Sequence, residues 1–252
     1  MSKRIDWIDQ VKGFGIFLVV YGHNFPITEK YIYSFHMPLF FLIAGLFHPV
    51  IQNKSTILKR AKTILIPYFL WSFLLFIFWV FLGRFYGESA SLDLSIYKNF
   101  IGIFFAQGGQ DFMDWGIPLW FLPTIFLTFL LFFFIKKIKN KYLEYFVIIL
   151  LTTIGFLLPY MWDVKFLWSL NVALVSLIFY ALGFYFKKVI TNENKPSWVL
   201  FIVLGILHFS LFTFNGKIDM YRSIYGNQIL FLINGLIGVL FYLSFFKLIP
   251  KF

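Results

Sequence analysis

The chain has 252 residues, of which 60% are hydrophobic and 24% aromatic, whereas only 13% are charged. Soluble domains are about 45–50% apolar and about 25% charged, so this composition excludes an ordinary soluble enzyme. The sequence contains no cysteine, which excludes disulfides and thiolate chemistry. Runs of about 20 apolar residues recur along the whole length and predict an all-α, polytopic transmembrane helical bundle.

The apolar runs predict about eight spans. They cover residues 11–25, 35–51, 64–83, 117–135, 142–160, 167–186, 198–214 and 227–248. With the N-terminus inside, 16 of the 22 lysines and arginines fall in inner segments, so the positive-inside rule predicts that both termini are cytoplasmic. The net charge of +11 is therefore mostly a topology signal, and we expect membrane lipid rather than nucleic acid as a partner.

The connecting segments are short, with one exception. Residues 24–30 predict a tight outer turn, and residues 52–63 predict a basic inner loop with Pro67 near the start of the third span. Residues 84–115 form the one long outer segment, and its apolar piece 100–106 is too short to span, which predicts a re-entrant or interfacial helix. No cleavable signal peptide and no soluble domain is predicted, so we expect one integral-membrane domain over residues 1–252.

The first span carries three ionisable residues, Asp9, Lys12 and His23. Lys12 and His23 are about three helical turns apart, which places both on one face with a separation of ~16 Å along the axis. Asp9 lies three residues before Lys12 and is expected to pair with it. An ionisable group within a membrane costs about 2.5–3.5 kcal/mol and is a functional hypothesis by default, although a snorkelling lysine and an interfacial histidine are the structural alternatives.

A second histidine, His36, opens the next span, so His23 and His36 flank one short outer turn. Two imidazoles at similar depth are suited to act as a base and its orienting partner, or to hold a substrate hydroxyl. The structural alternative is a polar residue at a helix N-terminus facing water. His48 and His208 have no evident partner in the sequence and are interpreted as structural.

Five segments resemble the membrane-bound acyltransferase-3 family. IDQVKGFGIFLVVYGH is similar to its helix-one motif, in which an Arg or Lys is followed after ten residues by His. YIYSFHMPLFFLIAGLF resembles its second motif, and KRAKTILIPYFLW, PLWFLP and FYALGFYFKK resemble later ones. The likeness follows the family's order over most of the chain, and within the family it resembles the fucose 4-O-acetylase-like sugar O-acetyltransferases.

The resemblance implies an enzyme that takes an acyl group, usually acetyl, from cytoplasmic acetyl-CoA and delivers it to a hydroxyl of a sugar or glycan. By motif position it gives His23 the role of the essential histidine and Lys12 that of its basic partner. It matches Arg60 to the first basic residue of an Arg-x-x-Arg pattern at the entry of the third helix. We expect a multi-pass protein of the cell membrane, of the bacterial inner-membrane type.

The chain departs from the family pattern at three places. Thr63 occupies the second basic position of the third-helix pattern, with Lys62 beside it, and Ala44 replaces the serine of a Ser-Gly pair. The family usually has ten spans and a late histidine motif, so this chain is expected to lack the last two helices.

Two polar groups are candidates for substrate binding. Basic residues after the second span suit the phosphates of acetyl-CoA, the expected co-substrate, although a topology signal alone explains them equally; they are Lys54, Lys59, Arg60 and Lys62. Aromatic and acidic residues at the end of the long outer segment suit a sugar, although an aromatic belt with solvated acids is the alternative; they are Asp111, Asp114, Trp115 and Trp120.

The leading hypothesis is therefore an integral-membrane O-acetyltransferase of a cell-surface sugar or polysaccharide. His23 is the expected base, assisted by His36, with Asp9 orienting Lys12. Acetyl-CoA is expected at Lys12, Lys59, Arg60 and Lys62, the acceptor at Asp111, Asp114 and Trp120, and no metal. One alternative is a transporter that moves a sugar or lipid-linked solute along the helix face carrying Lys12 and His23. The other is a catalytically inactive assembly subunit. The acceptor and the oligomeric state are not predicted.

Overall fold

The computed structural model describes residues 5–51, 53–107, 109–162 and 166–249. Over these ranges the chain is all-helical, and its β-type pairing is one isolated bridge between Asp219 and Ile224. The predicted all-α class is confirmed. The chain divides into a first unit, Met1–Phe47 with Phe179–Phe252, and a second unit, His48–Ile178.

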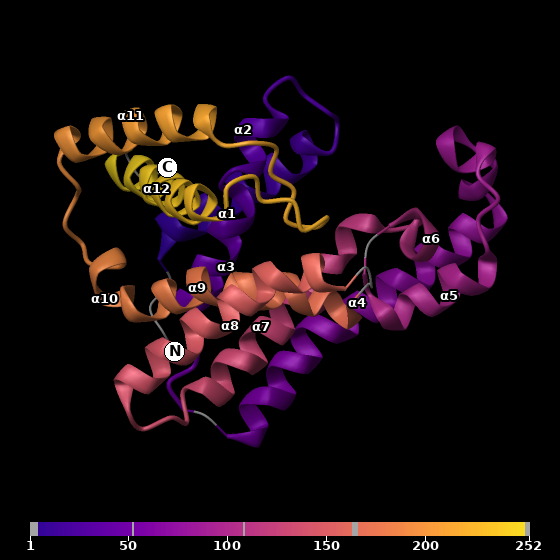
Figure 1. Cartoon of the computed structure of the whole chain (residues 1–252), viewed down its shortest axis with the longest axis horizontal. Coiled ribbons are helices and arrows are strands. Elements are labelled where there is room, and N and C mark those ends of the chain that lie inside the picture. The colour runs from indigo at the N-terminus through magenta and orange to yellow at the C-terminus, as the bar shows by residue number, and fades with distance from the viewer. Residues whose placement is uncertain (1–4, 52, 108, 163–165, 250–252) are drawn as a thin grey trace. The chain divides into compact units, whose positions relative to one another are not determined.

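The first unit combines the early and late parts of the chain (Figure 1). Within it α12 contacts α1, α3 and α11, so α12 is the helix around which the unit packs. Its helices are α1 (Asp6–Gly22), α2 (Glu29–Tyr33), α3 (His36–Leu46), the part of α9 (Leu170–Tyr185) from Phe179 onward, α10 (Lys187–Ile190), α11 (Trp198–Phe214) and α12 (Gln228–Leu248).

Two glycines allow α3 and α9 to cross with their backbones in contact. A Cβ at Gly45 would overlap the carbonyl group of Tyr180, and a Cβ at Gly183 would overlap that of Leu42. Membrane helices gain much of their association energy from such close van der Waals packing between small residues. The two glycines therefore hold the helix that begins with His36 firmly within the first unit.

The second unit contains the longest helix of the described chain, α4 (Lys54–Phe81), which contacts α7 and α5. The remaining elements are η1 (Gly83–Phe85), η2 (Gly87–Ser91), α5 (Ile96–Phe105), α6 (Gln110–Met113), η3 (Ile117–Trp120), α7 (Phe121–Ile135), α8 (Lys141–Met161), η4 (Leu167–Ser169) and the beginning of α9.

Two threonines of α7 fasten it to the neighbouring chain segment. Thr124 Oγ1 donates to the carbonyl of Trp120 at 2.8 Å and lies 3.1 Å from that of Trp168. Thr128 Oγ1 is 2.9 Å from the carbonyl of Thr124 and 3.4 Å from that of Ala173. Each hydroxyl thus lies within hydrogen-bond distance of a carbonyl four residues earlier in the chain and of a carbonyl in η4 or α9. Threonines in membrane bundles commonly form such contacts between helices.

The start of α4 corrects the predicted inner loop over residues 52–63. The helix begins at Lys54, and the side chain of Asn53 caps it by accepting the N–H of Thr56 at 2.9 Å. The low hydropathy of the lysines and the arginine that follow predicts a loop, but these residue types are good helix formers. Pro67 therefore lies inside α4 rather than near its start.

Each of the eight predicted spans overlaps a helix in the described ranges, although α3 covers only His36–Leu46 of the span predicted over residues 35–51. Five helical segments are long and apolar enough to cross a bilayer, namely α4, η3 with α7, α8, η4 with α9, and α12. α1 and α11 have 17 residues and α3 has 11, so the number of spans stays a prediction, as does the orientation of the termini. The piece predicted to be a short helix is α5, whose 10 residues are too few to span.

Candidate functional site

Lys12 and Asp9 form an ion pair on α1. Lys12 Nζ lies 3.0 Å from Asp9 Oδ1, and the two side chains are 39% and 37% exposed. The ammonium also lies 4.6 Å from the centre of the Phe47 ring, a cation–π contact. The carboxylate and the ring together hold the ammonium in place while leaving part of it accessible to a substrate.

His23 follows the last residue of α1 and is exposed. Its Nδ1 lies 2.7 Å from the carbonyl oxygen of Val19, one turn back along the helix. A carbonyl only accepts, so the Nδ1–H donates, and Nε2 is left as the lone-pair nitrogen that can take a proton. The local fold of α1 therefore fixes Nδ1 of the exposed His23 and leaves Nε2 for another partner.

His36 is the first residue of α3 and is only 6% exposed. Its Nδ1 lies 2.8 Å from the carbonyl oxygen of Ile32, which fixes the same tautomer as in His23. His23 and His36 therefore each have Nδ1 held by a backbone carbonyl, on either side of the turn between α1 and α3.

Tyr33, on α2, joins the two histidine positions. A Cβ at Gly22 would lie 3.1 Å from Cε1 of Tyr33, so the tyrosine ring packs against the end of α1 directly before His23. On its other side its ring centroid is 5.1 Å from that of His36. The sequence analysis missed Tyr33, because its role depends on where α2 directs the ring.

Asp219 was also missed, and it lies in the connection between α11 and α12. It is only 7% exposed, and burial raises the pKa of its carboxyl group. It interacts electrostatically with Tyr33 and Glu29 of α2. The one signal in the sequence was an acidic residue between two apolar helices. It could not reveal Tyr33 and Glu29, which are almost 190 positions away.

The predicted donor-binding residues Lys59, Arg60 and Lys62 lie on the first turns of α4, in the second unit. Lys59 and Lys62 are exposed, whereas Arg60 is half-buried, with its guanidinium carbon 5.6 Å from the centre of the Phe129 ring. Arg60 Nε is buried and has no hydrogen-bond partner within the described residues. Such a donor is suited to an anionic ligand.

Two further basic residues surround Arg60. His48, which is 2% exposed, interacts electrostatically with both Arg60 and Lys136. Lys136 Nζ pairs with Glu144 Oε1 at 2.8 Å, and the glutamate is 4% exposed. The charge of Lys136 is thus balanced by Glu144, and Arg60 remains the principal candidate for an anionic ligand.

The predicted acceptor residues Asp111, Asp114 and Trp120 also belong to the second unit. Asp111 is exposed and Trp120 is buried. Asp114 Oδ2 accepts hydrogen bonds from Trp79 Nε1 and Ser89 Oγ, both at 2.6 Å. The carboxylate of Asp114, at the end of α6, thus links α6 to Trp79 of α4 and to Ser89 of η2.

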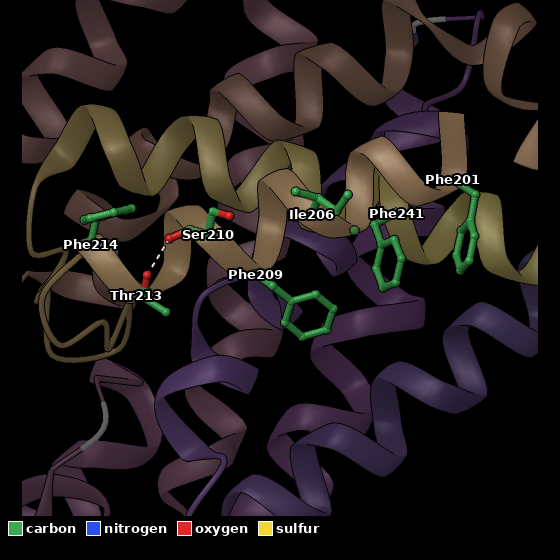
Figure 2. Close-up of a pocket in the computed structure, with 8 residues that line it drawn as sticks. Phe201, Ile206, Phe209, Ser210, Thr213, Phe214 and Phe241 are labelled. Carbon is green, nitrogen blue, oxygen red and sulfur yellow. Dashed lines mark hydrogen bonds between the residues drawn. The ribbon is translucent and has the colours of Figure 1, made fainter. Parts of the chain in front are cut away.

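An open groove of about 710 Å³ runs along α11 in the first unit (Figure 2). It is lined mainly by aromatic and aliphatic side chains, among them Phe201, Ile206, Phe209 and Phe241. Thr213 Oγ1 is occupied by its bond to the carbonyl of Ser210 at 2.6 Å. The groove contains none of the predicted site residues, and its lining suits apolar chains rather than a sugar.

No group of three or more potential metal ligands occurs among the residues that the structure describes. The described part of the chain combines apolar helices with two histidines held by backbone carbonyls and with exposed basic residues. The family model described as an acyltransferase domain, that of acyltransferase-3, matches residues 5–252, so the chain belongs to the acyltransferase-3 family and is a membrane acyltransferase. No curated protein and no solved structure gives a significant match. The predicted family is confirmed, and the fucose 4-O-acetylase-like subgroup stays a prediction.

Proposed function

We propose that this acyltransferase moves an acetyl group from acetyl-CoA to a hydroxyl of a sugar or polysaccharide at the cell surface. The observation that carries the proposal is the pair His23 and His36, each with Nδ1 held by a backbone carbonyl. Transfer from a thioester to an alcohol needs a base near the hydroxyl, and neutral imidazole suits this task near pH 7.

His23 is the proposed base. Its Nε2 takes the proton of the acceptor hydroxyl as the hydroxyl oxygen attacks the carbonyl carbon of the thioester. The bond between that carbon and sulfur then breaks, and the proton passes to the departing CoA sulfur. The Val19 carbonyl, 2.7 Å from Nδ1, stabilises the positive ring between these two events. His36 assists by orienting the hydroxyl.

Acetyl-CoA supplies several phosphate charges, and the proposal assigns them to the basic residues of α4. Arg60 is the principal candidate because its buried Nε lacks a partner among the described residues, and Lys59 and Lys62 offer exposed ammonium groups nearby in the sequence. Lys12, in the first unit, is retained as a separate candidate for binding acetyl-CoA, and Asp9 keeps its ammonium in place. Cytoplasmic acetyl-CoA is consistent with the inner location predicted for these residues.

The proposed acceptor is a hydroxyl-rich molecule, and Asp111, Asp114 and Trp120 are retained as candidates for one part of its surface. Family membership favours an enzyme, and no observation supports the transporter alternative. The proposal includes a cell membrane of bacterial type with the N-terminus in the cytoplasm, as the distribution of basic residues predicts.

Calorimetry with the detergent-purified chain tests the donor. We expect acetyl-CoA to bind with micromolar to submillimolar affinity, and Arg60→Ala to weaken binding by about tenfold or more, the usual effect of losing a charge-assisted hydrogen bond. Lys12→Ala tests the second basic residue separately. Lys98→Ala, which changes an exposed lysine of α5, is the control. Absence of binding by the unaltered chain would overturn the proposal.

A further inference from the structure

The first unit contains a buried polar pair that the proposed function does not use. His208 of α11 and Asn234 of α12 are both fully buried, and the two helices lie side by side (Figure 1). His208 Nδ1 lies 2.8 Å from Asn234 Oδ1, and because an amide oxygen only accepts, the Nδ1–H donates. The sequence offered no partner for His208, and the structure supplies one from the next helix.

This pair is a costly way to join two apolar helices. Nε2 of His208 and Nδ2 of Asn234 are buried and have no hydrogen-bond partner among the described residues. A buried polar atom left unpaired costs about 1–3 kcal/mol, whereas apolar side chains of the same shape at both positions are nearly neutral or stabilising. An ionisable residue inside the apolar helices of a membrane protein is a functional hypothesis by default. The pair therefore points to a role other than stability.

The imidazole of His208 occupies a space that a glycine leaves open. A Cβ at Gly238 of α12 would lie 2.5 Å from Cε1 of His208 and 2.8 Å from Cβ of Phe35. The glycine therefore lets the imidazole and Phe35 approach the backbone of α12 at the same point. The bond to Asn234 sets the rotation of the ring within this space.

The His208 ring supports two aromatic residues of the segment that leads to His36. Its centroid lies 5.2 Å from that of Phe35, edge to face at 90°, and 5.1 Å from that of Tyr31. Tyr242 of α12 adds a second support. Its ring stacks on Phe35 with centroids 4.5 Å apart, and its hydroxyl lies 2.9 Å from that of Tyr31. α11 and α12 thus hold residues 31–35 through their side chains.

The supported segment determines where the imidazole of His36 lies. Phe35 directly precedes His36, and its carbonyl accepts the N–H of Leu39 at 2.9 Å in the first turn of α3. The carbonyl that holds His36 Nδ1 at 2.8 Å belongs to Ile32, which directly follows Tyr31. A shift of either aromatic ring would therefore move the backbone that orients His36.

We propose that His208 is a positioning residue for His36 in acyl transfer. The bond to Asn234 fixes the rotation of the His208 ring. The ring in turn holds Tyr31 and Phe35, whose segment orients His36. The inference rests on the role of His36 in the proposed function, and His208 acts through His36 alone.

The competing explanation is that the pair only packs α11 against α12. The double variant His208→Leu/Asn234→Leu separates the two roles, because it exchanges both partners for apolar side chains of similar volume and leaves no polar atom unpaired. It also removes the ring on which Phe35 packs. Thr152→Val, which exchanges a buried polar side chain of α8 for an apolar one, is the matched control.

The first readout is the ¹⁵N spectrum of the histidine-labelled chain in detergent. The chain contains four histidines, and His36→Phe identifies the signal of His36. The unaltered chain should show His36 as a single tautomer with the proton on Nδ1. In the double variant this signal should shift or broaden while that of His23 stays the same, and Thr152→Val should leave both signals unchanged.

The second readout is kcat for acetyl transfer from acetyl-CoA to a mixture of methyl hexosides. The double variant should lower kcat about threefold to tenfold, because the loss of an orienting group limits the effect. Its KM for acetyl-CoA and its melting temperature should stay the same. In a His36→Phe background the double variant should cause no further loss of kcat, as expected of residues that act through one another.

A double variant with an unchanged His36 signal or with full kcat would overturn this inference and leave the acetyl transfer intact. An equal loss of kcat in the His36→Phe background would also overturn it, because the effect would then not pass through His36. So would a marked fall in the melting temperature of the double variant, which would assign the pair to the fold. A chain that acetylates no hexoside would instead overturn the proposed function, and this inference with it.

Discussion

Two polar regions of the molecule use the same residue types in opposite ways. In the second unit Asp114 receives hydrogen bonds of 2.6 Å from Trp79 and Ser89, and Asn99 Oδ1 accepts the N–H of Asp114 at 3.0 Å. In the described part of the first unit, the contacts of the Asp219 carboxylate with Arg222 are long, 3.3 and 3.7 Å. The carboxylate of Asp114 thus forms short hydrogen bonds that hold the fold together. The carboxylate of Asp219 is held in place by weaker contacts.

The same contrast extends to the surrounding side chains. Asn99 Nδ2 donates toward the carbonyls of Ser95, Gln110 and Asp111 at 3.2–3.3 Å, so its amide is occupied on every side. His23 and His36 instead use one ring nitrogen for a backbone carbonyl, which leaves the other as an acceptor. Polar groups whose hydrogen bonds are all formed within the protein stabilise the fold. Polar groups that are held in position but keep a free donor or acceptor are better candidates for binding or catalysis.

The largest expected structural effect comes from Asp114→Ala. It removes the acceptor of two short hydrogen bonds and leaves Trp79 Nε1 and Ser89 Oγ without it, at about 1.5–3 kcal/mol for each bond to a charged group. We expect a marked fall in the melting temperature in detergent. Trp79→Phe, which removes one donor, should lower stability about half as much. Equal stability of Asp114→Ala and the unaltered chain would contradict this assignment.

A smaller effect, and on activity rather than stability, is expected from His36→Phe. The phenyl ring keeps the packing against Tyr33 and removes both nitrogens. We expect kcat to fall about tenfold, because an orienting group is lost while His23 remains. The melting temperature should change little, and the KM for acetyl-CoA should stay the same. A variant with full kcat would assign His36 to the fold alone.

The sequence predicted the helices well where apolar runs determine them. Each predicted span overlaps a helix, since a helix satisfies the backbone polar groups of a long apolar run within a bilayer. The sequence prediction was wrong at the start of α4. The helix begins at Lys54, next to its cap Asn53, and so includes charged residues that precede the apolar run. Charge marks where a helix leaves the apolar region, not where the helix ends.

For the candidate site, the sequence predicted contacts that are local and missed those that are not. Lys12 and Asp9 are three residues apart on α1, so helix geometry alone brings them together. The ring of Phe129, which lies against Arg60, is almost 70 positions away from it in the sequence, and no spacing rule predicts that contact.

The most direct test of the account is the rate of acetyl transfer by His23→Gln. His23 is exposed and glutamine can still donate to the Val19 carbonyl, so the fold and the affinity for acetyl-CoA should be unchanged. Removing a general base should lower kcat by about 10²–10⁴-fold. A His23→Gln protein that melts normally, binds acetyl-CoA and transfers acetyl at the unaltered rate would contradict the central role of this histidine.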